Sequence, residues 1–239
     1  MTDLILDWKI NQVQLALFPN SLIIDGKTAL KYIGSAYKHI KELEGQQPMQ
    51  IPLPPEAPLE IPRIMLRSSD SKSSLNIALN RIDYYFDNNG NDKISDLNTL
   101  IIKKSTEIEK FLIESNISLL RIGLIYKSEA TVSDQTVADY LHYNFLKKER
   151  LINPREISIR YIYREKIANL DSNILIFVRP KGSGIDMDAN VMLLDIDANV
   201  IPELMKEIEE TKALDGKLKD FTSDALSRIN DRFEKFPSI

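Results

Sequence analysis

The stretch from residue 173 to residue 200 constrains the fold more than any other part of the sequence. It contains two apolar segments separated by a glycine-containing turn, and Pro202 then suits the first turn of a helix. Residues 174–178 are almost continuously apolar, which predicts a strand inside a sheet. Residues 191–197 form the second apolar segment and end in Asp195-Ile196-Asp197, which predicts a short, half-buried strand. Strands that precede a helix in this way predict an α+β fold with an antiparallel sheet.

The same order of elements occurs once earlier in the chain. Residues 64–79 place alternating apolar residues on both sides of a serine-rich turn, which predicts a hairpin. Apolar residues from Leu97 to Leu112 then recur at helical spacing and predict a long helix. We therefore predict two related strand–strand–helix units, residues 63–150 and 151–239, with the long helices packed on one face of the sheet.

The remaining sequence predicts an N-terminal strand and helix at residues 1–45 and a connector at residues 46–62. Six of the 11 prolines lie in this connector. Because proline lacks an N–H group and fixes φ, such spacing excludes a helix or a central strand and favours a stiff, extended segment. The four segments are also compatible with one continuous domain.

The overall charge narrows the classes of function. A net charge of -4 gives the chain no general affinity for nucleic acid, although a local basic patch would still bind it. The sequence has no cysteine, which excludes disulfides, thiol catalysis and cysteine-based zinc sites. No apolar run is long enough to span a membrane, and the first residues lack the basic start of a signal peptide. We expect a cytoplasmic protein that does not contact a membrane.

Two pairs of aspartates are the strongest candidates for a metal site. Asp186 and Asp188 are two residues apart, as are Asp195 and Asp197, so that each pair projects from one face of a strand. Carboxylates in this arrangement would supply oxygen ligands for Mg²⁺ or Mn²⁺. The alternative is that they mark the polar ends of a short hairpin strand. Because no nearby histidine or lysine completes a catalytic set, we favour the alternative and expect no cofactor.

Two further motifs resemble binding loops without matching them. Residues 26–28 read Gly-Lys-Thr, but Ser21 occupies the position where a phosphate-binding loop needs its first glycine. Residues 87–92 resemble a calcium loop, but Asp92 stands where that loop needs glycine. The first motif is better interpreted as a helix start and the second as a turn.

A basic stretch is the candidate nucleic-acid site. Its cations are Arg155, Arg160 and Arg164, with tyrosines interleaved, and the fold could add Arg121. A groove that combines cations with stacking rings suits single-stranded nucleic acid. However, Arg160 and Arg164 alternate with the tyrosines, so that cations and rings lie on opposite faces of a strand. This favours an ordinary solvated face.

Two short motifs resemble those of an uncharacterised, sporadically distributed prokaryotic family. Residues 121–126 read RIGLIY, similar to the family's Arg-x-Gly-Leu-Arg-Tyr strand, and residues 194–197 read LDID, similar to its late Leu-x-Asp-x-Asp strand. Residues 67–82 also resemble the family's earlier hairpin, whereas Ile125 replaces its second arginine. The resemblance covers most of residues 60–235. It supports the fold and implies no activity.

These observations favour a non-enzymatic binding or regulatory protein. We expect its partner to be another protein or a second copy of the chain. Two alternatives stay open: a nucleic-acid-binding regulator that uses the basic strand, and a divalent-metal-dependent enzyme that uses the acidic pairs.

Overall fold

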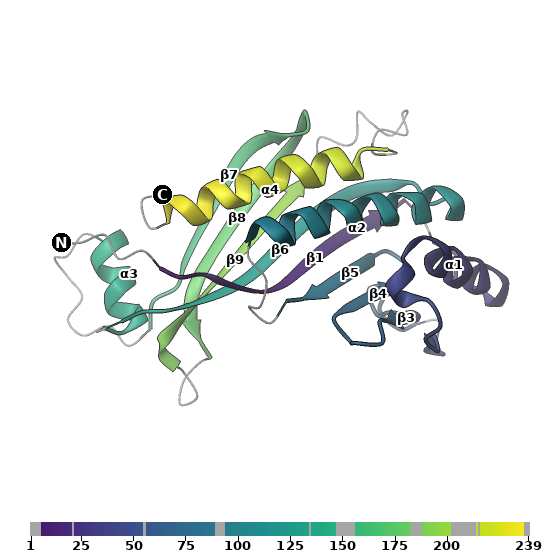
Figure 1. Cartoon of the computed structure of the whole chain (residues 1–239), viewed down its shortest axis with the longest axis horizontal. Helices are drawn as coiled ribbons and strands as arrows, with labels where there is room; N and C mark the ends of the chain where they lie inside the picture. The colour runs from purple at the N-terminus through teal and green to yellow at the C-terminus, as the bar shows by residue number, and fades with distance from the viewer. Residues whose placement is uncertain are drawn as a thin grey trace.

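The computed structural model describes residues 6–20, 22–54, 56–88, 94–133, 135–146, 156–182, 188–201, 214 and 216–236. Its strands form a single nine-stranded sheet in the order β2-β3-β4-β5-β1-β6-β9-β8-β7 (Figure 1). Every neighbouring pair in this sheet is antiparallel. The predicted α+β class with an antiparallel sheet is therefore confirmed.

The elements divide into two successive sets. The first consists of β1 (Lys9–Pro19), α1 (Gly26–His39), the 3₁₀ helix η1 (Lys41–Leu43), β2 (Met49–Gln50), β3 (Ile64–Arg67), β4 (Ser73–Ile77), β5 (Ile82–Asp87) and α2 (Ile94–Ser115). The second consists of β6 (Leu119–Thr131), α3 (Val137–Phe145), β7 (Ile159–Ile167), β8 (Leu170–Lys181), β9 (Asp188–Val200) and α4 (Leu218–Lys235). The hairpin and the long helix predicted from the sequence correspond to β3–β4 and α2. The helix predicted at Pro202 lies outside the described residues.

Both sets contribute to the sheet in the same order. From one side, after β2, the sheet runs β3-β4-β5-β1, and from the other it runs β7-β8-β9-β6. The strands β1 and β6 pair at the centre, where Leu15 lies opposite Leu124. The strand predicted at residues 174–178 lies within β8, between β7 and β9, and is next to the edge of the whole sheet.

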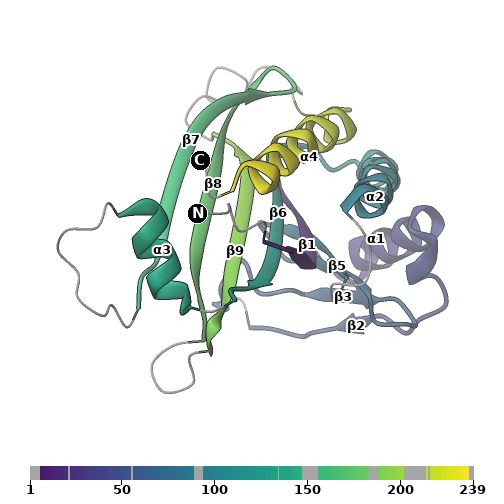
Figure 2. The same cartoon turned by 60° about the vertical axis from the view of Figure 1, so that its left-hand side comes forward.

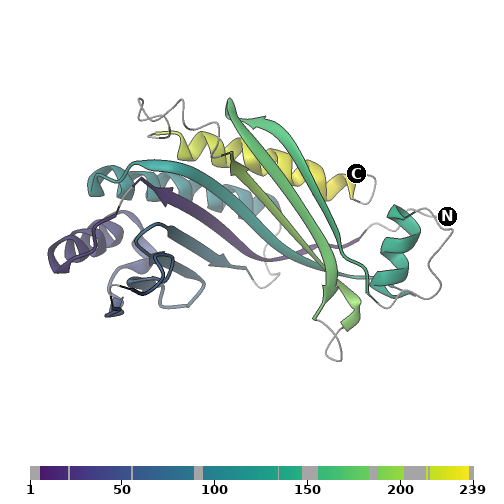
Figure 3. The same cartoon turned by 180° about the vertical axis from the view of Figure 1, so that it is seen from behind.

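Side chains alternate between the two faces of the sheet, and one face is buried. Leu15 on β1, Leu124 on β6 and Ile196 on β9 are among the side chains of this inner face, and each is almost fully buried. Of the helices, α2 lies between α1 and α4 and contacts both, as Figure 2 shows. Seen from behind in Figure 3, the long strands lie in front of α4.

The start of α1 explains the Gly-Lys-Thr motif. The Asp25 carboxylate accepts hydrogen bonds from the backbone N–H groups of Lys27, at 2.9 Å, and Thr28, at 2.7 Å. In return, the Thr28 hydroxyl accepts one from the Asp25 N–H at 2.9 Å. This reciprocal cap satisfies the free N–H groups of the first turn, as the helix-start interpretation predicts. Residues 89–92 of the calcium-like loop lie outside the described residues.

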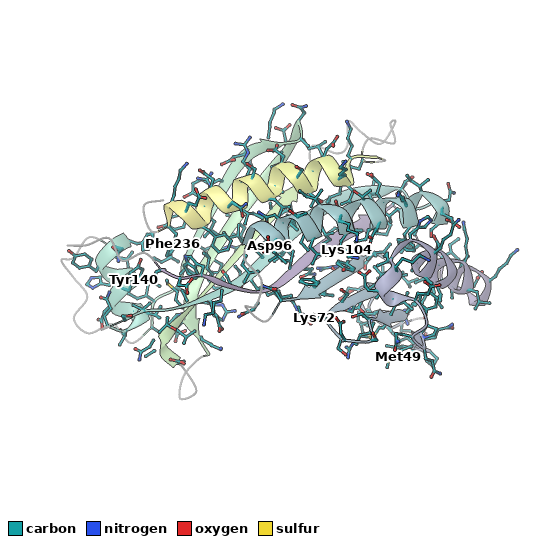
Figure 4. All side chains as sticks on the ribbon, in the orientation of Figure 1. Met49, Lys72, Asp96, Lys104, Tyr140 and Phe236 are labelled. Carbon is teal, nitrogen blue, oxygen red and sulfur yellow. The ribbon has the colours of Figure 1, made fainter. Side chains whose placement is uncertain are left out.

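A buried charged network fixes η1 and α2 to the sheet. The Lys104 ammonium, on a side chain that is 9% exposed, lies 2.6 Å from Glu42 Oε2 and 2.8 Å from Glu107 Oε2 (Figure 4). The Tyr84 hydroxyl donates to the other Glu42 oxygen at 2.9 Å and lies 3.0 Å from the Ser73 hydroxyl. Burial raises the pKa of Tyr84 well above its ordinary value, so that the phenol stays protonated. The charged and hydroxyl groups of this network bind one another, so that the network holds η1, α2 and the sheet of the first set together.

None of the helices among the described residues is long and apolar enough to cross a membrane.

Candidate functional site

The outer face of the sheet collects the candidate residues that the sequence leaves scattered. We define the outer face as the strand side chains that alternate with the buried ones. Lys127, Asp195, Phe177 and Arg160 form one row across β6, β9, β8 and β7, because each lies opposite the next in the strand register. Acidic and basic candidates therefore share one surface.

Neighbouring rows have the same character. The next row is Gln14, Ile125, Asp197, Leu175 and Ile162, and the one after it is Ala16, Gly123, Asn199, Asn173 and Arg164. The outer face thus mixes charged, amide and apolar side chains. Arg155 and Asp186 lie outside the described residues.

The position of Asp195 and Asp197 corrects the interpretation that they mark the end of a short strand. That interpretation is wrong because β9 runs from Asp188 to Val200, which places both aspartates in its interior. The strand is longer than its apolar pattern because it pairs along most of its length with β6 and β8. Both carboxylates are half-buried among the side chains of the neighbouring strands.

Burial is the main influence on these two carboxyls. It raises the pKa of Asp195, against the opposing effect of Arg179, whose guanidinium lies 3.6 Å from the carboxylate. It also raises the pKa of Asp197, where a hydrogen bond from Asn199 and the charge of Arg121 act in the opposite direction. One oxygen of Asp197, Oδ1, is buried without a hydrogen-bond partner among the described residues.

The described residues do not bring the predicted metal ligands together. Asp188 is exposed at the start of β9, seven positions from Asp195, which corresponds to about 23 Å along an extended strand. No group of three histidine, aspartate or glutamate side chains gathers in the described part of the chain in a way that could hold an ion. Asp195 and Asp197 remain a pair of half-buried acids beside basic neighbours.

The middle of the outer face is held together by its own polar contacts. Gln14 Nε2 donates to Asp83 Oδ1 at 2.8 Å, and Gln12 Nε2 donates to Asp87 Oδ1 at 2.6 Å. Arg81 Nε donates to the same oxygen of Asp83 at 2.8 Å. These contacts tie β5 to β1 and leave the groups they join with internal partners.

Arg121 belongs to this central region and does not join the arginines of β7. Its guanidinium lies 4.9 Å from the centre of the Phe18 ring, a cation–π contact with β1. The strands β9 and β8 separate β6 from β7, so that Arg121 is at least three strand spacings, about 14 Å, from Arg160 or Arg164. The predicted basic set is therefore divided between the centre of the sheet and its edge.

At that edge, β7 has two very different faces. Arg160, Ile162, Arg164 and Lys166 are exposed, and Ile162 is 60% exposed. The alternating tyrosines point to the other side, where Tyr161 contacts the Phe145 ring and Arg232 lies 4.7 Å from the centre of the Tyr163 ring. This confirms that the cations and the rings of β7 are on opposite faces, so that these tyrosines offer no stacking surface beside the arginines.

The positive charge of β7 is largely uncompensated on its exposed side. Glu165 points inward and pairs with Arg232 and Arg228 of α4. Across the register, Arg160 lies opposite Phe177 and Arg164 lies opposite Asn173, neither of which is acidic. Within the described ranges, neither arginine forms an ion pair. Lys166, in contrast, has Asp171 opposite it.

β7 is also an open edge. Among the described residues it is the last strand of the sheet and pairs only with β8, so that alternate backbone N–H and C=O groups along nine residues point outward. Leu175 and Phe177 on the neighbouring strand are half-buried beside Ile162 and Arg160. The site therefore offers a row of backbone hydrogen-bonding groups flanked by cations and apolar side chains.

Sequence reasoning identified Arg160 and Arg164 but missed Ile162 and the edge itself. The exposed isoleucine between two arginines was the available signal, because an apolar residue on the charged side of an alternating strand is unusual. The position of β7 in the sheet could not be read from the pattern. No protein-family model matches the chain, and no curated protein matches it.

Proposed function

We propose that this is a cytoplasmic, non-enzymatic binding protein and that the exposed edge of β7 is its contact surface for a protein partner. The observation that carries the proposal is the combination of Arg160, Ile162 and Arg164 on an edge strand that no other described strand covers. The outward backbone groups of this edge and the exposed Ile162 would both be covered when a partner binds.

The composition of the surface supports a protein partner. Arginine and large apolar side chains are enriched where protein interfaces bury most area, and Ile162, Leu175 and Phe177 would supply that area. The two arginines would provide charge complementarity, which increases the rate and the specificity of association. A partner that covers this edge also removes the risk of uncontrolled strand pairing.

Binding of nucleic acid is the alternative that the same arginines support. The inward direction of Tyr161 and Tyr163 speaks against it, since single-stranded nucleic acid binds where bases stack beside cations. Phe177 is the one ring that lies beside Arg160 in the register of the outer face. The experiment below separates the two alternatives.

The finer features of the predicted fold are also part of our proposal. We propose that the two sets of elements are related units, each with its long helix on the inner face. Apart from η1 and the two-residue strand β2 of the first set, both sets have the order strand, helix, three strands and helix, which supports this. The corresponding order of strands from each side of the sheet supports it as well. On this proposal β3 and β7 are equivalent strands.

The proposal is tested by purifying the tagged protein from its own cells with whatever it retains. We expect the wild type to retain a protein that the double variant Arg160→Glu/Arg164→Glu loses. The matched control is Arg67→Glu, because Arg67 is an exposed arginine on the outer face of β3. Nuclease treatment before elution should not release the partner.

Three results would contradict this proposal. Release of the ligand by nuclease would favour the nucleic-acid alternative. Turnover of a phosphodiester that depends on Mg²⁺ or Mn²⁺ and disappears in Asp195→Ala/Asp197→Ala would establish the metal-dependent alternative instead. Retention that is equal in the wild type and the β7 double variant would place the contact elsewhere.

A further inference from the structure

The two edges of the sheet differ in one respect that identifies what β7 could bind. At the first edge, β2 covers β3: Met49 lies opposite Met65 and Gln50 lies opposite Ile64 in antiparallel register. The Ile51 N–H extends this pairing, donating to the Arg63 carbonyl at 2.9 Å. A short extended segment of the chain itself therefore occupies this edge.

β3 and β7 hold corresponding places in the sheet. Each begins one of the two runs, β3-β4-β5-β1 and β7-β8-β9-β6. The segment on β3 comes from the proline-rich connector, and its two paired residues lie between Pro48 and Pro52. Prolines at these positions keep the segment extended while limiting the length over which it pairs. β3 thus shows how this sheet accepts an added strand.

We infer that β7 accepts an extended segment of the partner protein as an additional antiparallel strand, and that this segment carries two acidic residues four positions apart with an apolar residue midway between them. This inference rests on the proposed function, and it specifies which side chains the partner's segment carries. Side chains directly opposite on one face of an antiparallel pair are about 5 Å apart. Acids opposite Arg160 and Arg164 and an apolar side chain opposite Ile162 would satisfy all three.

A second copy of the chain is a poorer occupant. If two β7 strands paired antiparallel about Ile162, Arg160 of each copy would face Arg164 of the other. Like charges directly opposite each other destabilise a strand pair. Charge on this edge thus opposes self-association and favours an acidic segment.

The segment that precedes β7 in the chain is a poorer occupant for the same reason. Residues 147–155, which lie outside the described residues, contain four lysines and arginines and one glutamate. Their net positive charge does not complement Arg160 and Arg164.

The test uses a capped nine-residue peptide with glutamate at its third and seventh positions, valine at its fifth and threonine elsewhere, which carries an N-terminal fluorophore and is titrated into the protein at low salt. We expect micromolar binding to the wild type and to Arg67→Glu, and at least tenfold weaker binding to Arg160→Glu/Arg164→Glu. A peptide with lysine in place of glutamate, and one with the same composition but all its glutamates together, should each bind at least tenfold more weakly. N-methylation of alternate residues along one edge of the peptide should have the same effect, because it removes the N–H groups that strand pairing needs.

Hydrogen exchange locates the peptide. We expect it to slow the exchange of the outward amides of β7 and to leave those of β3 unchanged. Equal binding of the N-methylated or rearranged peptide would overturn strand addition, and so would protection outside β7 or tighter binding of an oligothymidine than of the peptide. Amides of β7 that are already fully protected in the free protein would show that another segment or copy covers the edge.

Failure of this inference can be distinguished from failure of the proposed function. If no peptide binds but the partner retained from cells is still lost in Arg160→Glu/Arg164→Glu, then the binding function holds and strand addition does not. If the retained partner is insensitive to that variant as well, both fall.

Discussion

The two edges of the sheet are protected in different ways, and the difference indicates which one is functional. At β3 the chain covers its own edge with β2 and the prolines around it. At β7 no strand among the described residues lies outside, and the exposed side is charged instead. A strand that covers an edge blocks pairing with any partner, whereas charged side chains along an edge repel only partners of the same charge. An edge protected by charge is therefore closed to a second copy and open to an acidic segment.

In the first set of elements, the polar groups around Lys104 have internal partners. The largest effect that we predict comes from removing one of these partners. Lys104→Met removes the cation that lies between the half-buried carboxylates of Glu42 and Glu107, and we expect a loss of about 1–3 kcal/mol in the free energy of unfolding. Urea denaturation measures it. Lys110→Met, an exposed position on the same helix, is the control and should change stability by less than about 0.5 kcal/mol. An equally small change for Lys104→Met would show that this charged network contributes little to the stability of the fold.

A second prediction concerns a variant that weakens the covering of the edge at β3, so that this edge becomes more like β7. Ile51→Pro removes the N–H group that donates to the Arg63 carbonyl, and we expect a loss of about 0.5–1.5 kcal/mol. Hydrogen exchange at β3 should become faster while exchange at β7 stays the same. Faster exchange at both edges would mean that the two edges are not independent.

A third prediction compares the acids on the two halves of the outer face. Because burial raises the pKa of Asp197 in the folded state, its charge opposes folding above that pKa. Asp197→Asn should therefore increase stability at pH 7, and the gain should shrink as the pH falls toward 4. Asp83→Asn, whose carboxylate accepts hydrogen bonds from Gln14 and Arg81, should instead lower stability at pH 7. Urea titrations at several pH values measure both, and a loss for Asp197→Asn at pH 7 would contradict the assignment.

The smallest predicted effect on stability is at β7. Arg160→Glu/Arg164→Glu should change the free energy of unfolding by less than about 0.5 kcal/mol, because both side chains are exposed and form no ion pair within the described residues. The same variant should abolish retention of the partner. A large loss of stability would mean that these arginines serve the fold rather than a partner.

Local patterns predicted the elements of this protein better than their arrangement. Alternation in residues 157–164 predicted β7 and the opposite directions of its arginines and tyrosines, and helical spacing predicted α2. These are properties of neighbouring residues, and the sequence contains them directly.

Features that depend on pairing between distant strands could not be predicted in this way. The interior position of Asp195 and Asp197 follows from the length over which β9 pairs with β6 and β8. The separation of Arg121 from Arg160 follows from two intervening strands, one of which lies about 70 residues further along the chain than β6. The open edge of β7 likewise depends on the order of all nine strands.

The most direct test of the central claim is hydrogen exchange on the protein purified with its own partner, compared with the same protein after the partner has been removed. We predict that the partner slows exchange at the outward amides of β7, Ile159–Ile167, and leaves β3, Ile64–Arg67, unchanged. Unchanged exchange at β7, with protection at any other surface, would contradict the claim that this edge is the binding site.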